Sequence, residues 1–294
     1  MSFEPAKLAK QYCVDHGKKF KLKKVDPGDT ANLNKKKQAV DELGESVTTL
    51  CELQEKLYAQ SEWSLLLIFQ AMDAAGKDGT IKHVLSGVNP QGCDVTSFRA
   101  PSERERKHDF LWRGALALPE RGKIEVFNRS YYEELLVVRV HPEYLEKQKL
   151  PQKLVSKRIW DERFESINDF ERHLTRNGTV VLKFFLHISP EEQKKRLLAR
   201  LDDKAKNWKF EVADLAERKR WDRYMGAFEE MVQATATEDA PWYVVPADHK
   251  WFARLVVSSV VIETLRRLDL HVPTLSAEET LELDAARKAL ETDE

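Results

Sequence analysis

The chain contains 294 residues, and its 48 lysines and arginines nearly balance its 49 aspartates and glutamates, giving a formal net charge of −1 at pH 7. Hydrophobic residues make up 42% and charged residues 33%, which indicates a globular protein with a highly charged surface and excludes a disordered one. The three cysteines form no C-x-x-C pattern, so they indicate neither a disulfide framework nor a zinc site. Because the sequence has no long apolar run and no apolar leader, we expect a cytoplasmic protein that is neither exported nor membrane-spanning.

The first element that the sequence predicts is an amphipathic helix, from Lys36 to Gln60, because its apolar residues are spaced by threes and fours. It leads into the apolar run from Trp63 to Phe69, which is typical of a strand buried on both faces. Residues 70–80 interrupt the pattern with two glycines, and a helical spacing resumes at Ile81. This order of strand, glycine loop and helix predicts a first βα unit.

Four more short apolar runs follow, each separated from the next by a helix-like stretch, at Val95–Phe98, Ile124–Phe127, Val180–Ile188 and Trp242–Val245. This alternation predicts an α/β fold in three layers, with a parallel sheet between helices. We expect the functional loops at the carboxyl ends of these strands, where open parallel sheets bind ligands. We also expect three parts: a Lys-rich segment with a helical arm at 1–60, one catalytic domain at 61–270 and an acidic tail at 271–294.

The segment from Ala71 to Thr80 has the composition of a phosphate-binding loop between a strand and a helix. Its glycines allow close approach of the backbone, and its N–H groups and the helix N-terminus attract phosphate oxygens. Lys77 adds a full positive charge. The segment departs from the G-x-x-x-x-G-K-[ST] pattern, since Ala71 replaces the first glycine and Asp78 stands where a hydroxyl would hold magnesium. On the pattern alone, a turn with a surface lysine is an equal alternative.

Several sequence blocks resemble those of the polyphosphate kinase 2 family, in the family's order and across residues 65 to about 268. They are Met72 to Thr80, with Asp73 before the Gly-Lys pair, and then His108 to Arg113, Phe127 to Glu133, Lys183 to Ser189 and Ala240 to Ala247. The resemblance implies a P-loop kinase-like fold with a helical lid. It also implies dependence on Mg²⁺, with Mn²⁺ as the alternative ion, and reversible phosphoryl transfer between inorganic polyphosphate and nucleoside mono- or diphosphates. A homodimer or homotetramer is expected on the same ground.

The resemblance also assigns roles within the phosphate loop. It implies that Lys77 is catalytic and that Asp73 is both catalytic and a metal ligand. The expected phosphate-binding or nucleotide-binding residues in and beside the loop are Ala75, Gly76, Asp78, Gly79, Thr80 and Lys82.

The expected third strand ends in Asn128-Arg129-Ser130, where many members of the family have Asp-Arg-Ser with a metal-binding aspartate. The asparagine resembles one subgroup, which phosphorylates both nucleoside mono- and diphosphates. Asn128 offers only a neutral oxygen, so Asp73, helped by Glu133, would supply the negative charge that Mg²⁺ prefers. Asn128 could instead merely cap the helix expected at Ser130. Arg129 is expected to bind a phosphate, with a structural salt bridge as the alternative.

Two further regions are expected to contact phosphates. The stretch from Pro190 to Trp208 reads as a cationic helix, and P-loop kinases close such a lid, here around 190–210, over the phosphates. Arg196 and Arg200 share one helix face, and by resemblance Arg200 corresponds to a lid arginine. A solvated charged helix is the alternative. Arg113 is expected to bind a phosphate, unless it pairs with Asp109.

The sequence therefore predicts a transferase that moves phosphoryl groups directly and in line, without a covalent enzyme intermediate. Lys82, Arg129 and Arg139 are expected to line a cationic groove for polyphosphate, with the early lysine runs as the alternative. One rival function is an ATP-dependent nucleotide kinase, which would not need such a groove. The other is a non-catalytic protein that binds polyphosphate or RNA. The near-neutral charge and the absence of an aromatic and basic RNA motif argue against nucleic acid as a partner.

Overall fold

The computed structural model describes residues 4–33, 36–205 and 207–292. From the N-terminus the elements are α1 (Pro5–Gln11), β1 (Cys13–Val14), α2 (Lys36–Gln60), β2 (Ser64–Ala71), α3 (Lys77–Val84), β3 (Cys93–Ser97), α4 (Trp112–Ala115), β4 (Ile124–Asn128), α5 (Val137–Val140), α6 (Glu143–Glu146), α7 (Ile159–Arg176), β5 (Thr179–His187), α8 (Pro190–Asp202), α9 (Ala213–Arg218), α10 (Trp221–Thr235), β6 (Trp242–Pro246), α11 (Lys250–Arg266) and α12 (Ala277–Thr292).

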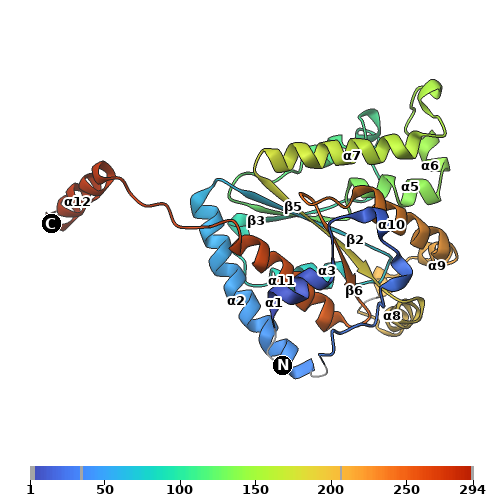
Figure 1. Cartoon of the computed structure of the whole chain (residues 1–294), viewed down its shortest axis with the longest axis horizontal. Helices are drawn as coiled ribbons and strands as arrows, with labels where there is room; N and C mark the ends of the chain where they lie inside the picture. Colours follow the sequence, from blue (N-terminus) through green and yellow to red (C-terminus); the bar gives the residue numbers. More distant parts are fainter. Residues whose placement is uncertain (1–3, 34–35, 206, 293–294) are drawn as a thin grey trace.

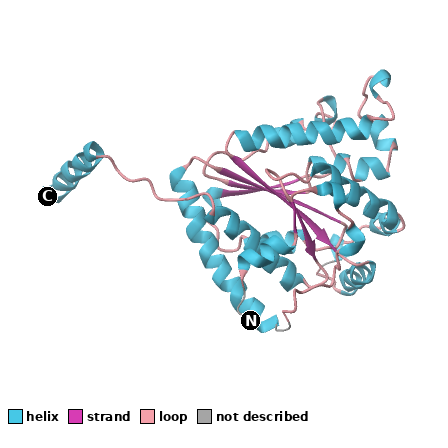
Figure 2. Ribbon diagram, viewed as in Figure 1, coloured by secondary structure: helices cyan, strands magenta, loops and turns pink. Residues whose placement is uncertain are grey.

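The strands form one six-stranded sheet in the order β1-β6-β5-β2-β4-β3, shown between the helices in Figures 1 and 2. Five strands are parallel, and β1 alone is antiparallel, to β6. All five strands that the sequence predicted are confirmed. After β2 the chain visits β3 and β4 on one side of β2 and then β5 and β6 on the other side. The strand order therefore reverses at β2, which is the position where open α/β sheets form their ligand crevice.

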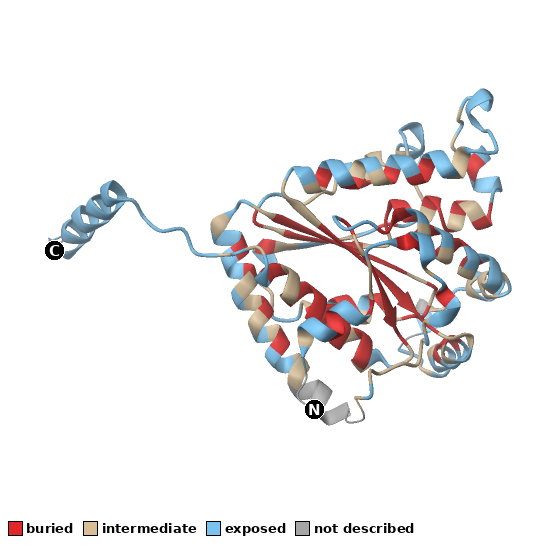
Figure 3. Ribbon diagram, in the orientation of Figure 1, coloured by how far each residue is buried: buried red, intermediate tan, exposed pale blue. Residues whose placement is uncertain are grey.

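Helices cover both faces of the sheet, which confirms the three-layer fold (Figure 1). On one face α11 packs against α1, α2 and α3, and on the other α10 packs against α5 and α7. The strands β2, β4, β5 and β6 are buried almost throughout, as Figure 3 shows, whereas the edge strand β3 is partly exposed. Among the described helices, none is long and apolar enough to cross a membrane.

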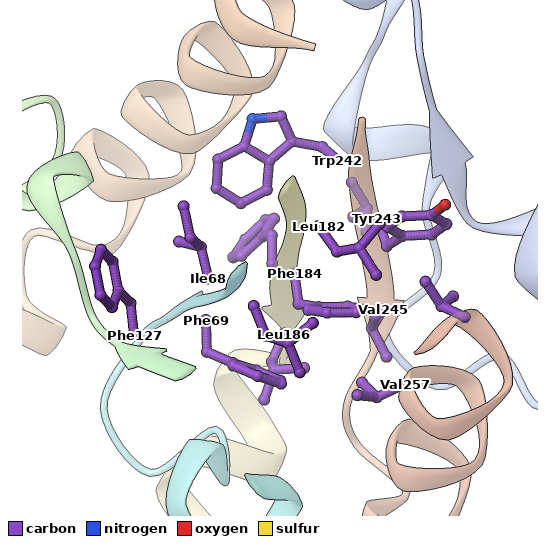
Figure 4. Close-up of a cluster of buried hydrophobic side chains, with 14 of the residues drawn as sticks. Ile68, Phe69, Phe127, Leu182, Phe184, Leu186, Trp242, Tyr243, Val245 and Val257 are labelled. Atoms are coloured by element: carbon purple, nitrogen blue, oxygen red, sulfur yellow. The ribbon is translucent and has the colours of Figure 1, made fainter. Parts of the chain in front are cut away.

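Aromatic side chains fill much of the core on both sides of β5 (Figure 4). Phe69 of β2 stacks on Phe184 of β5, with ring centroids 4.9 Å apart. Phe185, the next residue along β5, stacks at 4.0 Å on Phe228 of α10. Successive residues of a strand point to opposite faces, so a continuous apolar run serves both layers of helices. This packing holds β2 rigidly, and β2 carries the loop described below.

The N-terminal segment joins the sheet, which the sequence did not predict. Cys13 and Val14 pair with Tyr243 and Trp242 and extend the sheet beyond β6. The preceding helix α1 packs against α11. At the other end of the chain, α12 has no buried residue and projects away from the body in Figures 1 and 3. The division into an arm, a catalytic domain and a tail stays a prediction.

Candidate active site

The loop after β2 has the backbone conformation of a phosphate cradle. β2 ends at Ala71 and α3 begins at Lys77, as the strand, loop and helix pattern predicted. Ala74 (φ 62°) and Gly76 (φ 107°) both lie in the left-handed region. Glycine adopts this conformation freely, whereas alanine there costs about 1 kcal/mol or more, so surrounding contacts must hold the loop in place.

Lys77 is buried in the first turn of α3, so the alternative prediction of a turn with a surface lysine is wrong. Its Nζ donates a hydrogen bond to the carbonyl oxygen of Ala71 at 3.0 Å. Burial lowers the pKa of Lys77 to about 8, and the positive charge of Arg129 adds to this effect, while Asp73 and Glu133 oppose it. A buried ammonium with one neutral acceptor is well prepared to bind an anionic phosphate, because the phosphate would restore the favourable surroundings that burial removed.

The end of β4 and the turn after it bring Asn128 and Arg129 against this loop and the first turn of α3. β4 lies next to β2 in the sheet, with Asn128 opposite Phe69, and Arg129 then adopts a left-handed conformation (φ 64°). The Ser130 hydroxyl accepts from the backbone N–H of Tyr132 and caps the short 3₁₀ helix Tyr131–Glu134. The alternative role of Asn128 as the helix cap is therefore wrong, because Ser130 fills it.

A buried network fixes the position of this turn. The hydroxyls of Tyr131 and Tyr132 both donate to the same oxygen of Glu171 on α7, at 2.9 and 2.8 Å. The other oxygen of Glu171 accepts from Lys183 of β5 at 2.5 Å. Breaking a buried ion pair leaves an uncompensated charge, so the network holds the turn to the sheet and to α7.

Arg129 bridges two carboxylates. Its Nη2 donates to Asp73 in the phosphate loop at 2.8 Å, and its Nη1 donates to Glu133 at 3.2 Å. These carboxylates, Glu133 first, raise the pKa of Arg129 further above its usual value. The salt bridges that the sequence left as an alternative are thus present, and phosphate binding by Arg129 stays a prediction.

Asn128 contacts the acidic residue of the phosphate loop. Its Nδ2 donates to Asp78 Oδ1, on the first turn of α3, at 2.8 Å. Asp78 of α3 therefore places a carboxylate directly beside the amide of Asn128 at the end of β4. This pairing joins the two departures from the common motifs, which the sequence analysis treated separately.

The residues expected to bind a metal offer hard oxygen ligands, the type that Mg²⁺ prefers. Asp73 and Glu133 share the guanidinium of Arg129, and the amide of Asn128 contacts Asp78. Within the described residues, no group of three or more His, Cys, Asp or Glu side chains is gathered as a complete metal site. Mg²⁺ in kinases is commonly held by one or two carboxylates together with substrate phosphates and water, so Asp73 and its neighbours fit this ion.

The two arginines expected in the lid occupy different environments. α8 ends at Asp202, earlier than the predicted helix end at Trp208. The Nη1 atom of Arg200 lies 3.6 Å from Oδ2 of Asp214 on α9. Arg196 is buried and donates to backbone carbonyls of the phosphate loop and of the segment after β6. The burial of Arg196 is incompatible with a fully solvated helix.

The remaining expected ligands are spread more widely. Arg113 donates to the carbonyl oxygen of Arg99 at 2.7 Å and lies over the ring of Phe98, and Asp109 instead accepts from a backbone N–H. Lys82 is exposed on α3. Arg139 donates to Glu230 on α10 and faces aromatic rings of α7, so it lies within the helical layer on one side of the sheet.

Several residues that shape the site were missed from the sequence. Gln193 of α8 donates to the carbonyl oxygen of Asp73 at 3.0 Å, and Arg218 of α9 donates to Gln193 at 2.8 Å. Burial raises the pKa of Asp214, and the negative charge of nearby Asp73 raises it further. None of these residues lies in a recognisable motif. Only their place on or after a cationic helix could have drawn attention to them.

A glycine-containing loop between the central strand and a helix, with a buried lysine and adjacent acidic and arginine side chains, defines a phosphotransferase of the P-loop kinase type. Residues 32–272 match the sequence profile of the family described as Polyphosphate kinase 2. The chain belongs to this family and is a transferase.

Relatives and solved structures agree with this placement. The chain is 51% identical over 286 residues to the ADP-polyphosphate phosphotransferase of Rhodopseudomonas palustris, with 96% of this chain and 98% of that protein covered. It is 45% identical over 265 residues to the AMP/ADP-polyphosphate phosphotransferase of Meiothermus ruber, with 90% and 95% covered. The crystal structure of Polyphosphate Kinase 2 from Arthrobacter aurescens superposes with a TM-score of 0.85 at 41% identity, covering 96% of this chain and 97% of that one.

Proposed function

We propose that this enzyme transfers phosphoryl groups from inorganic polyphosphate to nucleoside mono- and diphosphates, and that it runs the reaction in both directions. The observation that carries the proposal is the cluster of Lys77, Arg129 and Asp73 around the phosphate loop, in a chain of the Polyphosphate kinase 2 family. The names of the relatives from R. palustris and M. ruber support the choice of donor and acceptors.

Transfer is direct and in line. An oxygen of the acceptor's terminal phosphate forms a bond to the last phosphorus of polyphosphate, while the bond from that phosphorus to the bridging oxygen breaks. The shortened polyphosphate leaves with the electron pair of the broken bond, so no covalent enzyme intermediate is needed. Such a transition state requires mainly positioning and neutralisation of charge.

The protein supplies these two effects from a few groups. The N–H groups of the loop and the Lys77 ammonium hold the donor's terminal phosphate, and Arg129 neutralises charge beside it. Arg200 approaches from the lid side, where it contacts Asp214. Arg113 contributes on the acceptor side. Asp73, with Asn128 and Glu133 nearby, would hold Mg²⁺, which supplies further neutralisation of phosphate charge when bound.

An ATP-free assay tests the proposal and separates it from an ordinary nucleotide kinase. The purified protein is incubated with Mg²⁺, polyphosphate and AMP, and the products are followed over time. We expect ADP first and ATP later, because one site then serves both acceptors. Lys77→Ala, prepared in parallel, controls for contaminating kinases. If no nucleotide is phosphorylated until ATP is added, the enzyme uses ATP and the proposal is wrong.

A second arm addresses the acceptor range. If ADP accumulates but ATP never forms, even with added ADP and excess polyphosphate, the enzyme accepts only monophosphates. If ADP is used and AMP is not, it resembles in this respect the R. palustris relative, whose name mentions ADP alone. We further propose that the protein is cytoplasmic and that it forms a homodimer or homotetramer. Light scattering coupled to gel filtration would test the oligomeric state.

A further inference from the structure

Three consecutive carbonyl groups of the phosphate loop accept hydrogen bonds from side chains of α8. Gln193 Nε2 donates to the oxygen of Asp73 at 3.0 Å. Arg196 Nη1 donates to the oxygens of Ala74 and Ala75, at 3.3 and 2.7 Å. The loop carbonyls are therefore held from the α8 side along the stretch where Ala74 adopts its left-handed conformation.

The other nitrogens of Arg196 also have protein acceptors. Its Nη2 donates to the oxygens of Ala247 and Asp248, in the segment after β6, at 2.7 and 2.9 Å. Its Nε donates to Glu192 at 2.8 Å. A guanidinium has five N–H groups, and these contacts occupy all five. Arg196 is 7% exposed, so it is enclosed by the groups it contacts and has no donor left for a phosphate.

We propose that Arg196 and Gln193 are positioning residues of the phosphate loop and that Arg196 does not touch polyphosphate. The N–H and C=O of a peptide unit point in opposite directions, so carbonyls held toward α8 turn loop N–H groups toward the donor phosphate. A released carbonyl could rotate toward the phosphate oxygens and repel them. This inference rests on the proposed function, and it gives Arg196 a positioning role in place of the phosphate binding expected from the sequence.

Arg218 completes the arrangement by fixing the direction of the Gln193 amide. Arg218 Nη1 donates to Gln193 Oε1 at 2.8 Å and to the carbonyl oxygen of Pro190 at 2.7 Å. Because the amide oxygen of Gln193 faces this cation, its NH₂ group faces Asp73. α9 is thereby connected to the phosphate loop through Arg218 and Gln193. It follows that the first turns of α8, which carry Gln193 and Arg196, act as a fixed support, and that any closure over the phosphates involves Arg200 and the segments after it.

The test compares three variants with a matched control on the same helix. Arg196→Lys keeps the charge but cannot span the four carbonyls, Arg196→Gln removes the charge, and Gln193→Ala removes the neutral donor. Lys194→Gln is the control, because Lys194 is exposed on α8 and its substitution removes one charge without touching the loop. For each protein, kcat and KM are measured for polyphosphate and ADP at several salt concentrations, together with the Tm with and without tripolyphosphate.

We expect both Arg196 variants to lower kcat/KM for polyphosphate by about 100-fold and Gln193→Ala by about tenfold, because small misplacements of binding groups have such effects. Since no phosphate contact is lost, the slope of log(kcat/KM) against log[salt] should match wild type. A lost phosphate contact would instead reduce that slope by about 1. The tripolyphosphate-induced rise in Tm should shrink in parallel, and Lys194→Gln should behave as wild type.

Two results would overturn the inference. One is near-normal kcat/KM in Arg196→Lys, which would show that only the charge matters. The other is a salt slope reduced by about 1 in Arg196→Gln, which would show a direct phosphate contact. If Arg196→Gln does not fold, Arg196→Lys and Gln193→Ala still decide, and an unaffected Gln193→Ala removes Gln193 from the proposal. A wild-type protein that neither transfers phosphate nor gains stability from tripolyphosphate would contradict the proposed function instead.

Discussion

Exchanging the partners of the Asn128–Asp78 hydrogen bond tests whether these two residues act as one unit. The variants are Asn128→Asp, Asp78→Asn and the double exchange. In the wild type the Asn128 amide donates to the Asp78 carboxylate at 2.8 Å. Asn128→Asp places two carboxylates face to face, Asp78→Asn leaves two neutral amides, and the double exchange restores one amide and one carboxylate in reversed positions.

The size of the effect follows from the distance and the exposure. Two unit charges about 4 Å apart repel by about 1 kcal/mol in a water-like medium and about 4 kcal/mol at an effective dielectric constant of 20. Asp78 is exposed, so solvent screening favours the lower end. With the lost hydrogen bond, we expect Asn128→Asp to lower the free energy of unfolding by about 2 kcal/mol, or Tm by about 3 °C in a chain of this length.

Urea unfolding in EDTA, repeated with Mg²⁺, measures this coupling. The double exchange should recover about 1–2 kcal/mol relative to the sum of the single changes. Added Mg²⁺ should stabilise Asn128→Asp more than wild type, because a dication relieves the repulsion of paired carboxylates. If the effects of the two single changes on the free energy of unfolding add to within about 0.5 kcal/mol, the two residues are independent. Asn128 and Asp78 then do not act as one unit.

Four further outcomes follow from the site. Lys77→Ala should reduce kcat at least about 1,000-fold while Tm stays near wild type, because the lysine acts on phosphate; normal turnover would remove the phosphate-loop assignment. Because burial lowers the pKa of Lys77 to about 8, kcat/KM for polyphosphate should fall above pH 8, whereas kcat should hold to higher pH since bound phosphate favours the charged lysine; a flat kcat/KM profile to pH 10 speaks against this. Asp73→Asn should raise the Mg²⁺ concentration for half-maximal rate about tenfold, and an unchanged requirement excludes Asp73 from the metal site. Burial raises the pKa of Glu125 from 4.5 to about 7, so the folded state binds more protons between these values and stability declines as pH rises through them. Glu125→Gln should therefore stabilise the protein by about 2 kcal/mol at pH 8 and very little at pH 5, as urea unfolding would show, and an equal effect at both pH values would contradict this.

The parts of the fold that the sequence predicted are those that local patterns determine. The run from Leu65 to Phe69 is apolar throughout because both of its faces are covered, and that pattern is visible without the structure. β1 was not predicted, because Cys13 and Val14 form a strand only by pairing with β6. Two residues show no periodicity, so such a strand depends on tertiary contact alone.

The candidate site divides in the same way. Lys77 and the loop around it could be predicted, because the strand, loop and helix are contiguous and their chemistry is specific. The environment of Arg196 could not, because the carbonyls it contacts come from residues about 50 and 120 positions away. Asn128 and Ser130 are both good capping residues, and only the backbone geometry of the turn shows that Ser130 is the cap.

The pairing of β1 with β6 also bears on how the molecule is completed during synthesis. Tyr243 follows its partner Cys13 by roughly 230 residues, so at about 5–20 residues per second the ribosome needs about 10–45 s between making one and the other. Throughout that interval the N-terminal segment has no strand to join. Refolding from denaturant begins with both strands present, so the sheet edge should form by a different order of events in the cell and in the test tube.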